Sequence, residues 1–135
     1  MPNERVLVTG ATGMIGTAVV AALLNDGFTV RTFVHKESAE KLPKHPKLET
    51  ALGDMRDASA LLHATENVDW VVHLAACKND EPESEAVNVG GARNLVVACK
   101  THRVRCILNV STQSVKLPRK GTYARTKAAA DAVFA

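Results

Sequence analysis

The chain has 135 residues, of which 46% are hydrophobic, and its formal net charge is +3 at pH 7. These values are ordinary for one globular domain that buries its own core. The small charge predicts no nucleic-acid partner, and the longest apolar run, residues 18–24, is far shorter than the roughly 20 residues that a membrane span needs. The five histidines show no metal-ligand spacing, so no metal site is predicted.

Strand and helix patterns alternate along the chain. Strands are predicted at 5–9, 29–34, 48–52, 68–74 and 105–110, and helices at 14–25, 57–63, 83–100 and from about 123 to the last residue. The nearly continuous apolar run 68–74 is typical of a strand covered on both faces. Alternating strands and helices predict an α/β fold with a parallel sheet and right-handed crossovers.

A glycine-rich turn joins the first strand to the first helix. It reads Thr9-Gly10-Ala11-Thr12-Gly13-Met14-Ile15-Gly16. Glycines at such a turn let an anionic ligand approach the backbone, and the helix N-terminus offers it peptide N–H groups and the positive end of the helix dipole. The pattern predicts a pyrophosphate-binding turn with strand order 3-2-1-4-5, which is a Rossmann-like, doubly wound sheet.

A second motif, Tyr123-Ala124-Arg125-Thr126-Lys127, stands near the other end of the chain. Together the two motifs resemble the short-chain dehydrogenase/reductase superfamily, in its extended, epimerase/dehydratase-like branch. The resemblance covers the whole chain but only about the first half of a typical member. It implies that residues 1–135 are an NAD(P)-binding Rossmann domain, truncated before the substrate-binding part.

The resemblance implies a set of cofactor-binding residues. Gly-Asp after the third strand would meet the adenine through Asp54 and the adjacent backbone of Met55, and the small residues after the fourth strand would approach the nicotinamide ribose. No acid stands at the end of the second strand before Glu37, whereas Arg31, His35 and Lys36 could attract a 2′-phosphate. This favours NADP over NAD. The predicted cofactor-binding residues are Gly10, Thr12, Gly13, Met14, Ile15, Gly16, Arg31, His35, Asp54, Met55, Leu74, Ala75, Ala76 and Lys127.

The resemblance also implies the catalytic residues. Tyr123 would exchange a proton with the substrate, and Lys127, four residues later on the same helical face, would lower the pKa of the tyrosine and bind the nicotinamide ribose. Thr112 would orient the substrate oxygen, with Ser111 in reserve and Ser114 less favoured. Asn88 would complete a proton relay toward the lysine.

The sequence therefore allows two functions. The first is an NAD(P)-dependent oxidoreductase or epimerase/dehydratase that transfers a hydride at a carbon bearing oxygen and takes a carbonyl, hydroxyl or nucleotide-sugar substrate. The second is a non-catalytic dinucleotide-binding module or sensor. The three cysteines, Cys77, Cys99 and Cys106, have apolar neighbours and no paired spacing. They predict reduced core thiols in a cytoplasmic protein. Because residues 1–4 lead straight into the first strand, no signal peptide is predicted, and a homo-oligomer is left open.

Overall fold

The computed structural model describes residues 4–76, 81–110 and 122–135 of the chain. Strands and helices alternate as predicted, and the glycine turn links the first strand to the first helix. The elements in chain order are β1 (Arg5–Thr9), α1 (Met14–Asn25), β2 (Thr29–Val34), the 3₁₀ helix η1 (Lys36–Lys41), β3 (Leu48–Leu52), α2 (Ala58–Ala64), β4 (Trp70–His73), α3 (Glu81–Ser84), the π-helix η2 (Glu85–Gly90), α4 (Gly91–Thr101), β5 (Cys106–Asn109) and α5 (Thr122–Phe134).

The strands form one parallel sheet in the order β3-β2-β1-β4-β5, which confirms the predicted topology. β1 is the central strand, and its last residue, Thr9, pairs with Phe33 of β2 on one side and with His73 of β4 on the other. The carboxyl ends of β1, β2 and β4 therefore meet at one edge of the sheet, at the point where the strand order reverses. In open α/β sheets this is the place where ligands bind.

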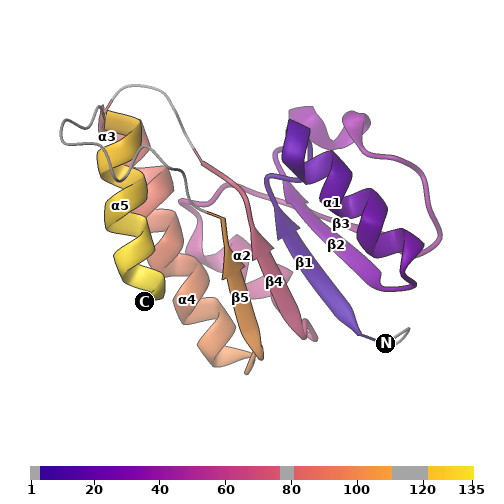
Figure 1. Cartoon of the computed structure of the whole chain (residues 1–135). Coiled ribbons are helices and arrows are strands. Elements are labelled where there is room, and N and C mark those ends of the chain that lie inside the picture. Colours follow the sequence, from indigo (N-terminus) through magenta and orange to yellow (C-terminus); the bar gives the residue numbers. More distant parts are fainter. Residues whose placement is uncertain (1–3, 77–80, 111–121) are drawn as a thin grey trace.

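Helices cover the two faces of the sheet, as Figure 1 shows. On one face Val6 and Val8 of β1 pack with Val20 of α1, and on the other Leu7 packs with Leu61 of α2 and Leu95 of α4. All six side chains are nearly inaccessible to water. The alternation along β1 thus follows from the two-residue period of a strand, which sends successive side chains to opposite faces.

The predicted helix 83–100 departs most from expectation, because it is divided into α3, η2 and α4. The π-helical part, Glu85–Gly90, contains Asn88 and is followed by Gly91. Asparagine and glycine are poor helix formers. In addition, a Cβ at Gly91 would lie 2.8 Å from the Cβ of Met55, so the glycine lets η2 and α4 pack closely onto the turn after β3.

The cysteines only partly follow the prediction of core thiols. Cys99 is buried in α4, and burial raises the pKa of its thiol to about 12. Cys106 is exposed, so the prediction is wrong for that residue, because β5 is an edge strand with a neighbour on one side only. Cys77 lies outside the described residues.

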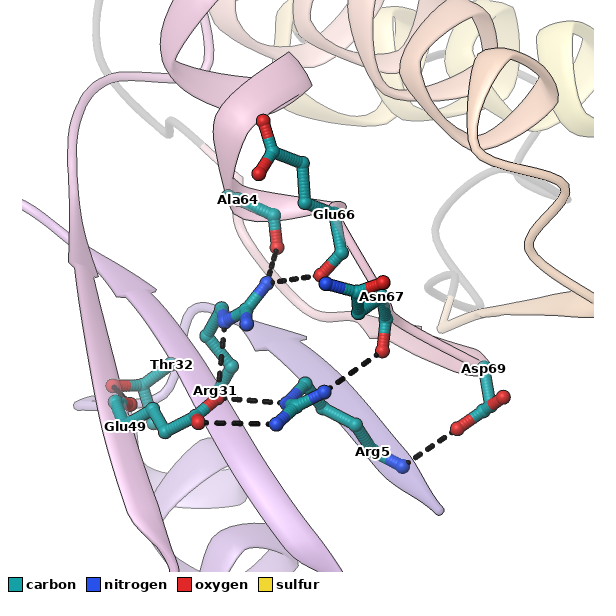
Figure 2. A network of polar contacts seen from close by, with 8 residues as sticks. All are labelled: Arg5, Arg31, Thr32, Glu49, Ala64, Glu66, Asn67 and Asp69. Atoms are coloured by element: carbon teal, nitrogen blue, oxygen red, sulfur yellow. Dashed lines mark hydrogen bonds and ion pairs between the residues drawn. The ribbon is translucent and has the colours of Figure 1, made fainter.

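A cluster of charged side chains crosses three strands on the face that carries α2 (Figure 2). Glu49 of β3 accepts hydrogen bonds from Arg5 of β1 (Nε to Oε1, 2.8 Å) and from Arg31 of β2 (Nε to Oε1, 3.2 Å). The same guanidinium groups reach the turn between α2 and β4: Arg31 donates to the carbonyl oxygens of Ala64 (2.8 Å) and Glu66 (2.7 Å). Glu49 therefore joins β1, β2 and β3 through two arginines.

The cluster predicts a pH-dependent contribution of Glu49 to stability. Partial burial alone would raise the pKa of Glu49, but the hydrogen bonds and charges of Arg5 and Arg31 outweigh it, so the pKa lies below its ordinary 4.5. A carboxyl whose pKa is depressed by folding stabilises the protein above the unfolded-state pKa and loses that contribution as the pH falls through the folded-state pKa.

We expect Glu49→Gln to lower the free energy of unfolding at pH 7 and to make progressively less difference below pH ~4.5. Urea unfolding at a series of pH values measures this, with the exposed Glu40→Gln as the matched control. A Glu49→Gln penalty that stays constant from pH 7 to pH 3 would contradict the charge-based explanation.

Candidate functional site

A cleft of about 560 Å³ lies at the carboxyl ends of β1 to β4. Four chain segments that follow these strands line it, together with side chains from α3 and η2. The lining residues are Gly10, Thr12, Gly13, Phe33, Val34, His35, Ser38, Gly53, Asp54, Met55, Arg56, Leu74, Ala75, Ala76, Glu83 and Val87. Nine of the residues predicted to bind a cofactor are in this set, although they come from parts of the chain up to 66 residues apart.

The glycine turn forms one wall of the cleft. Gly10 has φ +71°, which side chains rarely tolerate, and a Cβ on it would lie 2.8 Å from the peptide nitrogen of Ala75. A Cβ on Gly16 would collide with the carbonyl oxygen of Gly10. Gly13 differs from both, because a Cβ there would meet only the Gly10 oxygen, at an ordinary 3.5 Å. Gly10 and Gly16 are thus required by backbone packing, whereas the bare backbone at Gly13 leaves space in the cleft.

Met14 and Ile15 form the first turn of α1 beside this wall. Their side chains are 92% and 59% exposed and do not line the cleft. The N-cap of α1 is Gly13, which makes no side-chain capping bond. What these residues can offer a ligand is their peptide N–H groups, since the first N–H groups of a helix have no acceptor within the helix.

The wall after β4 is tied to β1 by the hydroxyl of Thr9. Thr9 Oγ1 accepts hydrogen bonds from the peptide nitrogens of Leu74 (3.0 Å) and Ala75 (3.2 Å) and lies 2.7 Å from Nδ1 of His73. Since both N–H groups donate to Oγ1, the hydroxyl proton is the one directed at His73. Thr9 thereby orients the backbone of two cleft-lining residues from the neighbouring strand.

This geometry determines the state of His73. Its Nδ1 accepts from Thr9, so the ring proton is on Nε2 and the imidazole is neutral. Burial, with a smaller contribution from the positive charge of Lys127, lowers the pKa of His73 to about 3. The residue is 1% exposed, and its ring packs against that of Phe134 in a tilted arrangement, with the ring centroids 5.3 Å apart. His73 is therefore a buried acceptor beneath the site rather than a proton-transfer group within it.

The wall after β3 carries an ion pair that the sequence did not predict. The Arg56 side chain donates two hydrogen bonds to the Asp54 carboxylate, from Nε to Oδ1 (3.0 Å) and from Nη2 to Oδ2 (2.6 Å). The peptide nitrogen of Arg56 also donates to Oδ1 (2.8 Å). These bonds lower the pKa of Asp54 to about 2, against the opposing effect of partial burial. Asp54 is thus a fixed anion at neutral pH. The spacing Asp-x-Arg after a strand was the available signal for this pair.

The wall after β2 holds His35 and Ser38 but not Arg31. Arg31 was predicted to meet a 2′-phosphate. The structure instead directs its guanidinium to Glu49 and to the carbonyl oxygens of Ala64 and Glu66 (Figure 2). The reason is the strand period: Arg31 pairs with Leu7 and shares its face of the sheet. Helix-terminal carbonyl groups lacking helical partners are strong acceptors for it there.

Two of the predicted catalytic residues, Asn88 and Lys127, lie where η2, α5 and β5 meet, and neither of them lines the cleft. Asn88 is buried and donates from Nδ2 to the hydroxyl of Thr126 (2.8 Å), next to Lys127. Lys127 is 3% exposed and donates from Nζ to the carbonyl oxygen of Val110 (3.2 Å). Burial lowers the pKa of Lys127, and the carboxylate of Asp131 opposes that effect. The structure thus brings together the segments that carry Asn88 and Lys127.

Other predicted catalytic residues are only partly described. Tyr123 belongs to α5 and lies one turn before Lys127, but its side chain is outside the described part of the structure. Thr112 and its alternatives, Ser111 and Ser114, lie in the segment 111–121, which is outside the described residues as well. In the described ranges, no helix is long and apolar enough to cross a membrane, and no group of three His, Cys, Asp or Glu side chains could hold a metal ion.

Comparison with known proteins agrees with this arrangement. The model of the NAD dependent epimerase/dehydratase family matches residues 6–133. The chain belongs to that family. It is thereby a member of the extended branch of the short-chain dehydrogenase/reductase superfamily, as its two motifs predicted.

Individual relatives are longer than this chain. A 3 beta-hydroxysteroid dehydrogenase/Delta 5→4-isomerase of Mycobacterium tuberculosis is 39% identical over 121 residues, which are 82% of this chain and 32% of the relative. An inverting UDP-N-acetylglucosamine 4,6-dehydratase of Campylobacter jejuni is 28% identical over 144 residues, 98% of this chain and 43% of the relative. A short-chain dehydrogenase/reductase superfamily protein of Agrobacterium tumefaciens, solved with bound NAD, is 31% identical with a TM-score of 0.83, over 96% of this chain and 44% of that one. The chain therefore spans about a third to less than half of these relatives.

Proposed function

We propose that residues 1–135 form the dinucleotide-binding domain of an NAD(P)-dependent oxidoreductase or epimerase/dehydratase. The observation that carries the proposal is the glycine-walled cleft at the switch point of the sheet, in a chain of the NAD dependent epimerase/dehydratase family. Bare backbone at Gly13 and the first turn of α1 supply room and N–H donors for a pyrophosphate. The residues present therefore fit a dinucleotide.

The remaining walls suit the other parts of such a cofactor. Asp54, a fixed carboxylate, has acceptor capacity beyond its bonds to Arg56 and would accept from the adenine amino group. Leu74, Ala75 and Ala76 form the opposite wall, where small residues allow the nicotinamide ribose to approach the backbone. A bound nicotinamide would supply the hydride donor or acceptor.

The protein's own share of the chemistry would be proton transfer and positioning. Tyr123 would exchange a proton with the substrate oxygen, and Thr112 would orient that oxygen. Lys127 would place a positive charge one helical turn from Tyr123, which favours the ionised form of a phenol. Asn88 would hold the helix that carries the lysine through Thr126.

The names of the relatives indicate a broad substrate class. One acts on a 3 beta-hydroxysteroid and another on UDP-N-acetylglucosamine, according to their names. Both substrates have carbons that bear oxygen, so we propose a carbonyl or hydroxyl substrate of that kind. The alternative is a dinucleotide-binding module without catalysis. Such a module would use the same cleft to bind the dinucleotide, but Tyr123 would have no role in it.

Dinucleotide binding can be tested at Gly13. We expect Gly13→Val to abolish stabilisation by NAD(H) or NADP(H) in a thermal-shift assay, because the side chain would fill the space left for the pyrophosphate. The fold should remain, since a Cβ at this position meets no atom closer than 3.5 Å. Ala18→Val, at an exposed position of α1, is the matched control. Equal ligand-induced shifts in the Gly13 variant and the control would refute the proposed site.

A preference for NADP(H) is the second expectation. With Arg31 bound elsewhere, its support is the absence of an acid at the end of β2 and the presence of His35 and Arg56 in the cleft. One charge-assisted hydrogen bond to the 2′-phosphate contributes ~1.5–3 kcal/mol, about tenfold or more in affinity. Calorimetry should show NADP binding more tightly than NAD, and His35→Asp should reverse the order by charge repulsion. Equal affinities in the unaltered chain would contradict the preference.

Catalysis is the third expectation. We expect residues 1–135 alone to bind the cofactor without turnover, because holding a substrate provides much of an enzyme's rate enhancement and the relatives are more than twice as long. Steady NADPH oxidation with a small carbonyl or keto-sugar that disappears in Tyr123→Phe would show that this domain is already competent. In a longer form of the protein, unchanged turnover in Tyr123→Phe would favour the non-catalytic module.

A further inference from the structure

The carboxyl end of β5 holds α5 at two points. Lys127 Nζ donates to the carbonyl oxygen of Val110 at 3.2 Å, and Asn109 Nδ2 donates to Asp131 Oδ1 at 2.8 Å. Lys127 and Asp131 are four residues apart and so lie on one face of the helix, while Asn109 and Val110 are consecutive. Two adjacent residues at the end of the strand thus engage two successive turns of the helix.

The orientation of the Asn109 amide follows from this contact. A carboxylate can only accept, so the NH₂ group must face Asp131. This orientation leaves the oxygen of the same amide without a partner: within the described part of the chain, Asn109 Oδ1 is buried and accepts no hydrogen bond. Leaving a buried acceptor unpaired is costly, which indicates that the bond to Asp131 dominates at this position.

The charged form of Lys127 depends on a neighbouring carboxylate, because the side chain is buried. The ammonium group is almost fully buried and donates to a neutral carbonyl oxygen, that of Val110. From β4 it faces His73, which is neutral and cannot balance its charge. On α5 itself it faces Asp131, one turn later, and Tyr123 is one turn earlier on the helix. Asp131 is the carboxylate that favours the charged form of this lysine.

We propose that Asp131, oriented by Asn109, is a positioning residue that keeps the buried Lys127 ammonium charged and in register with the end of β5. The role assigned to Lys127 rests on the proposed function, whereas the coupling between the two side chains does not. Because Asp131 acts through Lys127, it needs no contact with the substrate or cofactor. Loss of the carboxylate would release the proton of Lys127 at lower pH and loosen the helix that carries Tyr123.

The test is an NMR titration of the Lys127 side chain in this chain, with the resonance assigned by its absence in Lys127→Arg. Asp131→Asn should raise the acid dissociation constant of Lys127 by about tenfold, and Asp131→Glu, which keeps the charge, should restore most of the original value. Asn109→Ala, which retains the carboxylate but frees it to turn away, should move the titration in the same direction. Asp26→Asn, which removes an exposed carboxylate at the end of α1, should leave it unchanged.

An unchanged Lys127 titration in both Asp131→Asn and Asn109→Ala would overturn the proposal. If Asp131→Asn does not fold, Asn109→Ala and Asp131→Glu decide it by the same readout. NADP(H) affinity, measured in parallel between pH 6 and 10, separates the two ideas. Altered titration without dinucleotide binding in any variant, including the unaltered chain, would reject the proposed function and retain the coupling.

Discussion

The contact on which the site depends is a direct approach of two backbone segments, at Gly10 and at Leu74–Ala75. A single methyl group on Gly10 would lie 2.8 Å from backbone atoms of both residues. The approach is reinforced by the preceding residue, whose hydroxyl accepts from the same two peptide nitrogens. Gly10 lacks the side chain that would keep the turns after β1 and β4 apart, and Thr9, the last residue of β1, accepts the hydrogen bonds that hold them together. Both turns therefore line the same cleft.

Behind the cleft, buried polar groups are paired in ways that limit what each can do chemically. His73 is hydrogen-bonded to Thr9 and stays neutral, so its imidazole is a buried acceptor and not a proton carrier. Asn88 reaches α5 through Thr126. A buried polar group is tolerated only when its hydrogen bonds are made, and these bonds in turn restrict how η2, β4 and α5 can pack. Positioning and folding thus rest on the same contacts.

Much of the architecture could be predicted because it depends on local patterns. The apolar runs marked β1, β2 and β3 with the observed bounds, and the glycine turn predicted the start of α1. The division of the helix 83–100 was missed, although Asn88 and the two glycines after it were the local signal of a departure. In the site, Gly10, Gly13, Asp54 and the segment Leu74–Ala76 were predicted because each closely follows a strand, and the structure places them along the cleft. Arg31 was expected there too, but its guanidinium binds Glu49 and the end of α2, because being near a strand end does not decide which face of the sheet a side chain occupies.

The sequence by itself determined the order of strands and helices, the conformation of the glycine turn and the spacing of Tyr123 and Lys127. These properties depend on a few neighbouring residues, through side-chain period and backbone freedom. Tertiary structure alone decided the partners of several charged and polar groups: Glu49 for Arg31, His73 for Thr9 and Asn109 for Asp131. A hydrogen bond or ion pair goes to whichever group the folded chain brings within about 3 Å. In each of these pairs the partners are at least 18 residues apart, so no local pattern could indicate them.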